Sequence, residues 1–129
     1  MAAEAYNYDE SFIAGEDLSS SQYFFVYLSA ADTVSIATSP TAQASTPIGV
    51  LQNDPSSSQA AIVRLHGISR LSANGAISTL DLVTSSTDGQ GVTATTANEM
   101  VLGRANSAST AAAQLIELVM TGPSRFSST

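Results

Sequence analysis

The chain has 129 residues, a length that fits one domain large enough to bury a hydrophobic core. Eleven acidic residues stand against four arginines, lysine and cysteine are absent, and the formal net charge is −7. Clustered lysine and arginine supply most of the affinity of proteins for nucleic acid, so we expect no nucleic-acid partner. Without cysteine, disulfides and thiolate metal sites are excluded.

No stretch approaches the roughly 18 consecutive apolar residues of a membrane-spanning helix, so we expect no membrane association. The N-terminal residues are acidic, whereas a signal peptide is basic and then apolar, which predicts a soluble protein that is not secreted. Ser, Thr and Ala stand where charged residues are usual. Such short side chains lose little entropy at an interface and suit packing between many copies, although compositional bias of the source organism explains them equally well.

Residues 1–22 differ in composition from the rest of the chain. They carry five acidic residues, interleaved with the aromatic residues Tyr6, Tyr8 and Phe12. We predict an extended N-terminal arm over residues 1–22 and a β domain over residues 23–129. Exposed aromatic side chains gain little until a partner covers them, so the arm is expected to contact another surface. The alternative is a first strand or turn that packs on its own domain.

An alternating pattern begins after the arm and predicts a β-strand that is apolar on both faces. Its side chains divide between the two faces, with Phe24, Val26 and Leu28 on one and Tyr23, Phe25 and Tyr27 on the other. Because a strand of a half-exposed sheet needs only one apolar face, the second face is expected to meet another chain.

Further short strands are predicted along the rest of the chain, at residues 33–38, 48–51, 60–71, 77–84, 91–95, 100–105 and 115–120. Residues 39–47 are predicted to form a loop or an extended connection, and the alanine content of residues 108–114 allows one or two helical turns. Strands at this spacing predict an all-β fold, a small antiparallel sandwich or barrel with at most one short helix.

Two dipeptides predict tight turns between these strands. Asn74-Gly75 and Asp88-Gly89 both tolerate the positive φ angles of a type I′ hairpin. In the last strand, Ile116, Leu118 and Met120 are expected to point inward and Glu117 outward.

Catalytic chemistry has little support in this sequence. The one histidine, His66, lies in the middle of a predicted strand, and no nucleophile elbow of the G-x-S-x-G kind accompanies it. The acidic residues of the arm lack the alternating carboxylates and central glycine of a calcium loop, and no glycine-rich phosphate loop occurs. Asp54 and Asp81 fall in turns, where capping explains them. We therefore expect no enzyme, no metal and no cofactor.

Several segments resemble a family of phage proteins. The sharpest is the run of Gly49-Val50-Leu51-Gln52-Asn53-Asp54-Pro55, and residues 60–63, Gly67, 73–77, 81–84, 101–105 and 114–122 also match the pattern. The family is the small capsid decoration, or cement, proteins of tailed phages, in a group of unknown function related to head-fibre proteins. The resemblance covers residues 47–123. At Leu80 this chain departs from the pattern, because the family tends to have a glycine just before Asp81, which bears on the local turn geometry.

The resemblance implies a structural virion protein without an active site. It would be made in the host cytoplasm, bind the outer surface of the mature capsid, and cement the lattice between capsomers. The implied partner is the major capsid protein, and the implied assembly is a homotrimer. The residues expected to contact the capsid or a neighbouring subunit are Tyr6, Tyr8, Phe12, Tyr23, Phe25 and Tyr27.

Two other functions remain open from the residues. The first is a virion-displayed module that binds a host receptor or a carbohydrate through an aromatic platform of Tyr23, Phe25 and Tyr27. The second is a hydrolase that uses His66, which requires a substantial pocket around that side chain.

Overall fold

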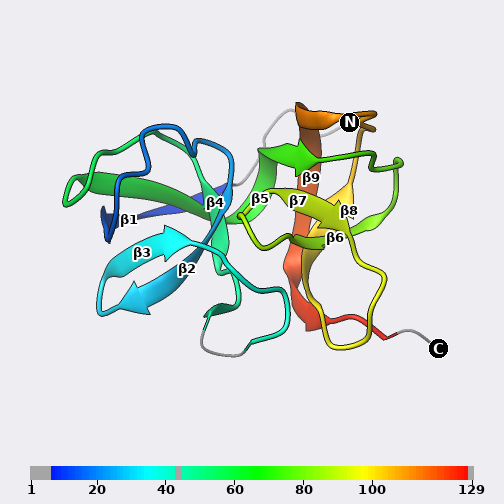
Figure 1. Ribbon diagram of the computed structural model, residues 1–129, viewed down its shortest axis with the longest axis horizontal. Helices are drawn as coiled ribbons and strands as arrows, with labels where there is room; N and C mark the ends of the chain where they lie inside the picture. The colour runs from blue at the N-terminus through cyan, green and yellow to red at the C-terminus, as the bar shows by residue number, and fades with distance from the viewer. Residues whose placement is uncertain (1–6, 43–44, 128–129) are drawn as a thin grey trace.

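The computed structural model describes residues 7–42 and 45–127, and the regular secondary structure within them is almost entirely β (Figure 1). The described residues contain no helix long and apolar enough to cross a membrane. The nine strands of this part are β1 (Tyr8–Ala14), β2 (Phe25–Ala30), β3 (Thr33–Ile36), β4 (Gly49–Leu51), β5 (Ala60–Asn74), β6 (Leu82–Ser85), β7 (Gly91–Thr93), β8 (Met100–Ala105) and β9 (Ala112–Arg125). The predicted all-β class is confirmed.

The strands close into two five-membered rings that share one strand. In the first ring the order is β1-β3-β2-β4-β5, and β5 pairs back with β1. In the second ring the order is β5-β7-β6-β8-β9, and β9 pairs back with β5. Figure 1 shows the two rings side by side, with β5 running between them. Each strand therefore pairs with at least two neighbours, so the described strands present no wholly unpaired edge to another chain.

The shared strand β5 has 15 residues and changes rings near its middle. Its first part pairs with β1 and β4, and its second part with β7 and β9. Gly67 lies at the change and has a φ angle of 114°, a conformation that residues with a side chain rarely adopt. The Asn7 side chain occupies the space beside Gly67 and accepts a 2.9 Å hydrogen bond from the Ile68 N–H.

Each ring has its own hydrophobic core. The first core consists of Ala14, Leu18, Val26, Val34, Leu51, Ala61 and Val63. The second core consists of Phe25, Ala37, Val50, Leu71, Ala73, Ile77, Val83, Leu102, Ala105, Ile116, Leu118 and Met120. Three members of the second core, Phe25, Ala37 and Val50, come from the chain segments that build the first ring, so the two rings are packed together and not merely joined by β5.

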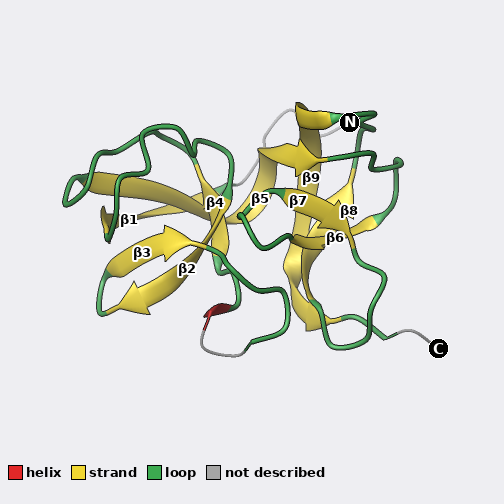
Figure 2. Cartoon of the chain, in the orientation of Figure 1, coloured by secondary structure: helices red, strands yellow, loops and turns green. Residues whose placement is uncertain are grey.

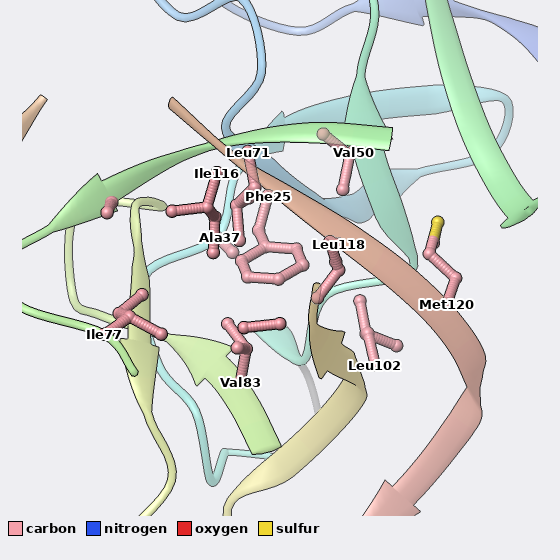
Figure 3. Packing of buried hydrophobic residues seen from close by; sticks show 12 residues of the cluster. Phe25, Ala37, Val50, Leu71, Ile77, Val83, Leu102, Ile116, Leu118 and Met120 are labelled. Atoms are coloured by element: carbon pink, nitrogen blue, oxygen red, sulfur yellow. The ribbon is translucent and has the colours of Figure 1, made fainter. Parts of the chain in front are cut away.

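Strands β2 and β4 lie between the two cores, which explains why β2 is apolar on both faces. Phe25 packs in the second core and Val26 in the first, and both are fully buried. Val50 and Leu51 of β4 divide in the same way. Figure 3 shows the Phe25 ring among other side chains of the second core. The second apolar face of β2 therefore meets the other ring of the same chain, and the prediction that Phe25 contacts a partner is wrong.

The N-terminal segment is part of the fold and is not a separate arm from Tyr8 onward. Strand β1 pairs antiparallel with β5 and parallel with β3. Ala14 and Leu18 are buried in the first core, and the Leu18 N–H donates a 2.9 Å hydrogen bond to the carbonyl oxygen of Pro55. From Tyr8 onward these residues form a first strand that packs on its own domain, which is the alternative to an arm. The predicted boundary between residues 22 and 23 therefore does not separate an arm from a domain.

One of the two predicted hairpin turns is present. Asp88-Gly89 joins the antiparallel strands β6 and β7, with a 2.8 Å hydrogen bond from the Ser86 N–H to the Gln90 carbonyl and a φ angle of 86° at Gly89. Three residues, 87–89, lie inside this hydrogen-bonded pair, so the turn is longer than the predicted two-residue type I′ turn.

Asn74-Gly75 forms no hairpin, because the segment after it crosses to another part of the chain. The Gly75 carbonyl accepts a 2.6 Å hydrogen bond from the Ser109 hydroxyl, and Ile77 forms a bridge with Ser109. This bridge also explains why residues 108–114 are not helical: pairing of Ser109 with Ile77 overrides the helix propensity of the alanines, and β9 begins at Ala112. In Figure 2 the helical colour appears only in the connection between β3 and β4, and residues 108–114 are drawn as loop and strand.

Candidate binding surfaces and inter-ring pocket

The structure does not bring the predicted interface residues together on one surface. Tyr6 lies outside the described residues. Tyr8 is 54% exposed, whereas Phe12 is half-buried against the first core. Tyr23 and Tyr27 are half-buried, and Phe25 is fully buried. Of the described members of the set, only Tyr8 presents most of its side chain to solvent.

Strands β1 and β5 form an outer surface of the first ring, which we call the β1–β5 face. Its apolar members are Ile13 of β1 and Ile62 of β5. Tyr8 lies opposite His66 at the other end of β1, and alternation along the strand puts it on the other side from Ile13. Ile13 is 48% exposed and Ile62 is half-buried. The side chains of Ala61 and Val63 point to the opposite side, into the first core. The β1–β5 face is thus a partly exposed apolar surface on the first ring.

One pair of opposite charges lies beside this face. Arg64 of β5 and Asp9 of β1 form an ion pair through two hydrogen bonds, of 2.7 Å from Nε and 3.0 Å from Nη2. The Arg64 Nη1 also donates to the carbonyl oxygen of Ile68 at 2.8 Å. The hydrogen bond to Asp9 is the main reason that the pKa of Arg64 is raised above its ordinary value. This pair fixes β1 on β5.

A second outer surface lies on β5 and β9 of the second ring, which we call the β5–β9 face. Its members alternate with core residues. Ile68 pairs with Val119 and Arg70 with Glu117, and the exposed Leu115 lies opposite Ser72, which is buried. Ile68 is 40% exposed and Leu115 is 48% exposed. The sequence pattern indicates this face, because Leu115 and Glu117 are out of phase with the inward-pointing Ile116, Leu118 and Met120. The predicted interface set contains only aromatic residues and therefore includes none of its members.

A polar pocket of about 250 Å³ opens between the two rings, at one end of the β5–β9 face. Its lining comprises Tyr23, Gln52, Arg64, Ile68, Ser69, Arg70 and Glu117. Tyr23 is fixed there by its backbone. Its N–H donates to the Leu51 carbonyl at 2.8 Å, and its carbonyl accepts from the Ser72 N–H at 2.9 Å. His66 is not among the lining residues, so this pocket does not provide the surroundings that a hydrolase with a His66 base requires.

Most of the polar groups in the pocket are held by fixed hydrogen bonds. Gln52 Nε2 donates to the Ser69 hydroxyl at 2.8 Å and to the Val50 carbonyl at 3.1 Å. The Ser69 hydroxyl donates to the Arg70 carbonyl at 2.8 Å. The Arg70 side chain has no hydrogen bond or ion pair with any described residue, although it lies opposite Glu117, whose carboxylate accepts from Asn106. The described residues contain no cluster of three or more potential metal ligands.

No family model matches the chain, and no curated protein matches it. Among solved structures, the chain is similar to the N base of the head fibre protein gp8.5 of bacteriophage phi29. The TM-score is 0.70 with 21% sequence identity, and the match covers 90% of this chain and 95% of that chain. The two chains therefore share one fold over nearly their whole length, and the fold of this chain is that of the base of a phage head fibre.

Proposed function

We propose that the chain is a structural protein of a phage head that binds the outer surface of the mature capsid and stabilises the lattice between capsomers. The observation that carries this proposal is the match in fold, over nearly the whole of both chains, with the base of a head fibre. The resemblance of residues 47–123 to capsid decoration proteins related to head-fibre proteins is consistent with this function. The partner in this proposal is the major capsid protein, and the chain has no catalytic activity.

The β1–β5 face is the surface that we propose for the capsid contact. Tyrosine is enriched in interfaces, and Tyr8 is the most exposed aromatic residue of the predicted set in the described part of the chain. Ile13 and Ile62 supply the apolar area of the face itself, Tyr8 lies at the end of β1 nearest the second ring, and Arg64 is already paired with Asp9. Because each described strand is paired on both sides, docking uses side-chain faces and not strand addition.

Co-sedimentation with capsids tests the function directly. The purified protein is mixed with expanded capsids and with unexpanded procapsids of the same phage, both lacking it. We expect it to pellet with the expanded capsids only, because the contact bridges capsomers in their mature spacing. Bound protein stabilises the expanded lattice by about 2.7 kcal/mol per site at a hundredfold excess over Kd, which capsid thermal melting would detect. Pelleting with neither particle contradicts the proposal.

A pair of matched substitutions tests the face. Ile13→Asp and Leu115→Asp each place a carboxylate at a position of 48% exposure, the first on the β1–β5 face and the second on the β5–β9 face. We expect Ile13→Asp to abolish capsid binding and Leu115→Asp to leave it unchanged, with equal thermal stability of the two variants. Loss of binding in Leu115→Asp but not in Ile13→Asp would mean that the second ring contacts the capsid. Removing residues 1–20 is not a suitable test, because it deletes β1 and Leu18 from the first core.

We further propose that the protein binds the capsid as a trimer. A trimer that contacts several capsid subunits at once gains avidity of roughly 10²- to 10⁴-fold from effective concentration, so each contact can be small. Sedimentation velocity at micromolar concentration should give three times the monomer mass. A monomer mass would contradict the trimer in solution without affecting the co-sedimentation result.

A further inference from the structure

We propose that the inter-ring pocket binds a single neutral sugar residue, an activity that goes beyond capsid binding and does not depend on it. The pocket lies at the junction of the two rings and opens beside the β5–β9 face, away from Ile13 on the β1–β5 face. Its members come from four separate parts of the chain: the segment before β2, the residue after β4, and strands β5 and β9.

The charges of the pocket balance, which favours a neutral ligand over an anion. Arg64 is neutralised by Asp9 through the two hydrogen bonds described above. Arg70 carries one positive charge, and Glu117, its partner position on β9, carries one negative charge. The chain as a whole has a net charge of −7, so it also repels anions at long range. A ligand rich in hydrogen-bonding groups but without charge fits these conditions.

The free polar groups of the pocket are of both kinds, donor and acceptor. The Arg70 guanidinium is a donor without a partner among the described residues, and no described residue bonds the Tyr23 hydroxyl. The Gln52 side chain uses its Nε2 in two hydrogen bonds, which leaves its Oε1 as an acceptor. Glu117 supplies a second acceptor. Neighbouring hydroxyls of a sugar each donate and accept, so they can satisfy such a mixed set, whereas a carboxylate or phosphate can only accept when ionised.

The size and walls of the pocket set the size of the ligand. Pockets for drug-sized ligands have volumes of roughly 300–1,000 Å³, so a volume of about 250 Å³ suits a single sugar ring. The half-exposed Ile68 and the ring of Tyr23 supply apolar surface for the C–H face of the sugar. The fixed backbone of Tyr23 and the Gln52–Ser69 hydrogen bond hold the site in one geometry before the ligand arrives, which lowers the entropic cost of binding.

Titration of the ¹⁵N-labelled full chain by NMR tests this inference. The probes are D-glucose, D-galactose, N-acetyl-D-glucosamine and, as the charged comparison, D-glucuronate, each at millimolar concentration. We expect at least one neutral sugar to shift the amide resonances of residues 68–70 and Gln52 in a saturable way, and glucuronate to bind more weakly than its neutral counterpart glucose.

Matched arginine variants connect the shifts to the pocket. Arg70→Met removes the donors but keeps the length of the side chain, and Arg104→Met makes the same change on β8, outside the pocket. Both arginines are exposed, so both variants should fold. We expect roughly tenfold weaker sugar binding in Arg70→Met, the cost of losing hydrogen bonds from a charged donor, and unchanged binding in Arg104→Met.

Three results would overturn the inference. The first is the absence of saturable shifts with all three neutral sugars, and the second is an equal loss of binding in the two arginine variants. Tighter binding of glucuronate than of glucose is the third, because it would make the pocket an anion site. None of these results alters the expectation for capsid co-sedimentation, which depends on Ile13 and not on Arg70.

Discussion

Leu80 occupies a backbone conformation that favours glycine. Its φ angle is 77°, and its side chain is 63% exposed. The backbone is held there because the Leu80 N–H donates to the Ala105 carbonyl at 2.8 Å, and the following residue, Asp81, accepts from the Ser78 N–H and the Thr93 hydroxyl. Leucine therefore adopts the glycine conformation at an energetic cost and gains little burial in return.

We expect Leu80→Gly to raise the free energy of unfolding by roughly 0.5 to 1 kcal/mol, as relief of left-handed strain outweighs the added freedom of the unfolded chain. Leu115→Gly is the control, since Leu115 is also half exposed but lies in the extended strand β9. There glycine should lower stability by about 0.5 to 1 kcal/mol. Urea unfolding measures the change in the free energy of unfolding in each variant. A change of the same sign in both would contradict backbone strain at Leu80.

The Asp9–Arg64 ion pair gives a second prediction for single residues. The two side chains are 32% and 20% exposed, so solvent screens the pair, and Asp9→Asn should cost no more than about 1 kcal/mol. The pKa of Arg64 is raised in the folded state, so its charged form stabilises the fold. This contribution to the free energy of unfolding is complete at neutral pH and is lost only as the pH rises through the raised pKa. The cost of Asp9→Asn should shrink in high salt. Asp32→Asn is the control, since Asp32 forms no ion pair among the described residues.

Among the elements, β5 is the one on which both rings depend, and Gly67 is where it changes rings. We expect Gly67→Ala to destabilise the protein more than Gly122→Ala. Both glycines have positive φ angles, of 114° and 92°. A Cβ atom at Gly67 would in addition clash with the Asn7 side chain, whereas no atom lies within 4 Å of one at Gly122. Denaturant unfolding measures the loss of stability in each variant, and the difference between the two losses gives the effect of the contact with Asn7. Equal losses would mean that the positive φ angle alone accounts for both.

The local sequence pattern predicts where strands lie better than it predicts what packs against each face of a strand. The alternation of residues 100–105 predicted β8 to the residue, and the inward positions of Ile116, Leu118 and Met120 in β9 are confirmed. Alternation cannot tell what covers each face, so Phe25 was assigned to an interface although the other ring buries it. Asn74-Gly75 and Asp88-Gly89 carry the same local signal, but only the second lies between strands that pair with each other.

The candidate site was only partly predictable for a related reason. Tyr23 was singled out from its own strand, and it does line the pocket. The other lining residues meet it only because β5 pairs with β9 and because Gln52 follows a strand, β4, that pairs with β5. These pairings join residues far apart in the sequence, and no local signal in one sequence specifies them.

At the scale of the whole molecule, the rings are expected to unfold together. Phe25 lies on a strand of the first ring but packs in the second core, so Phe25→Ala should cost about 3 to 5 kcal/mol and weaken both rings. Phe24→Ala, at the half-buried neighbouring position, should cost less. Calorimetry should show one transition in the wild type and in both variants, with loss of amide protection in β1 and β9 alike in Phe25→Ala. Separate transitions for the two rings would contradict the coupling.

The division of the strands between the rings also sets an order in which the chain can fold as it leaves the ribosome. Every pairing of the first ring uses residues between Tyr8 and His66, whereas the second ring closes only after β9 has been made. When the first ring closes, Phe25, Ala37 and Val50 have no second core to enter. For the time that synthesis of the next 60 or so residues takes, several seconds at typical rates, these apolar side chains form a patch on the nascent chain on which the second ring then assembles.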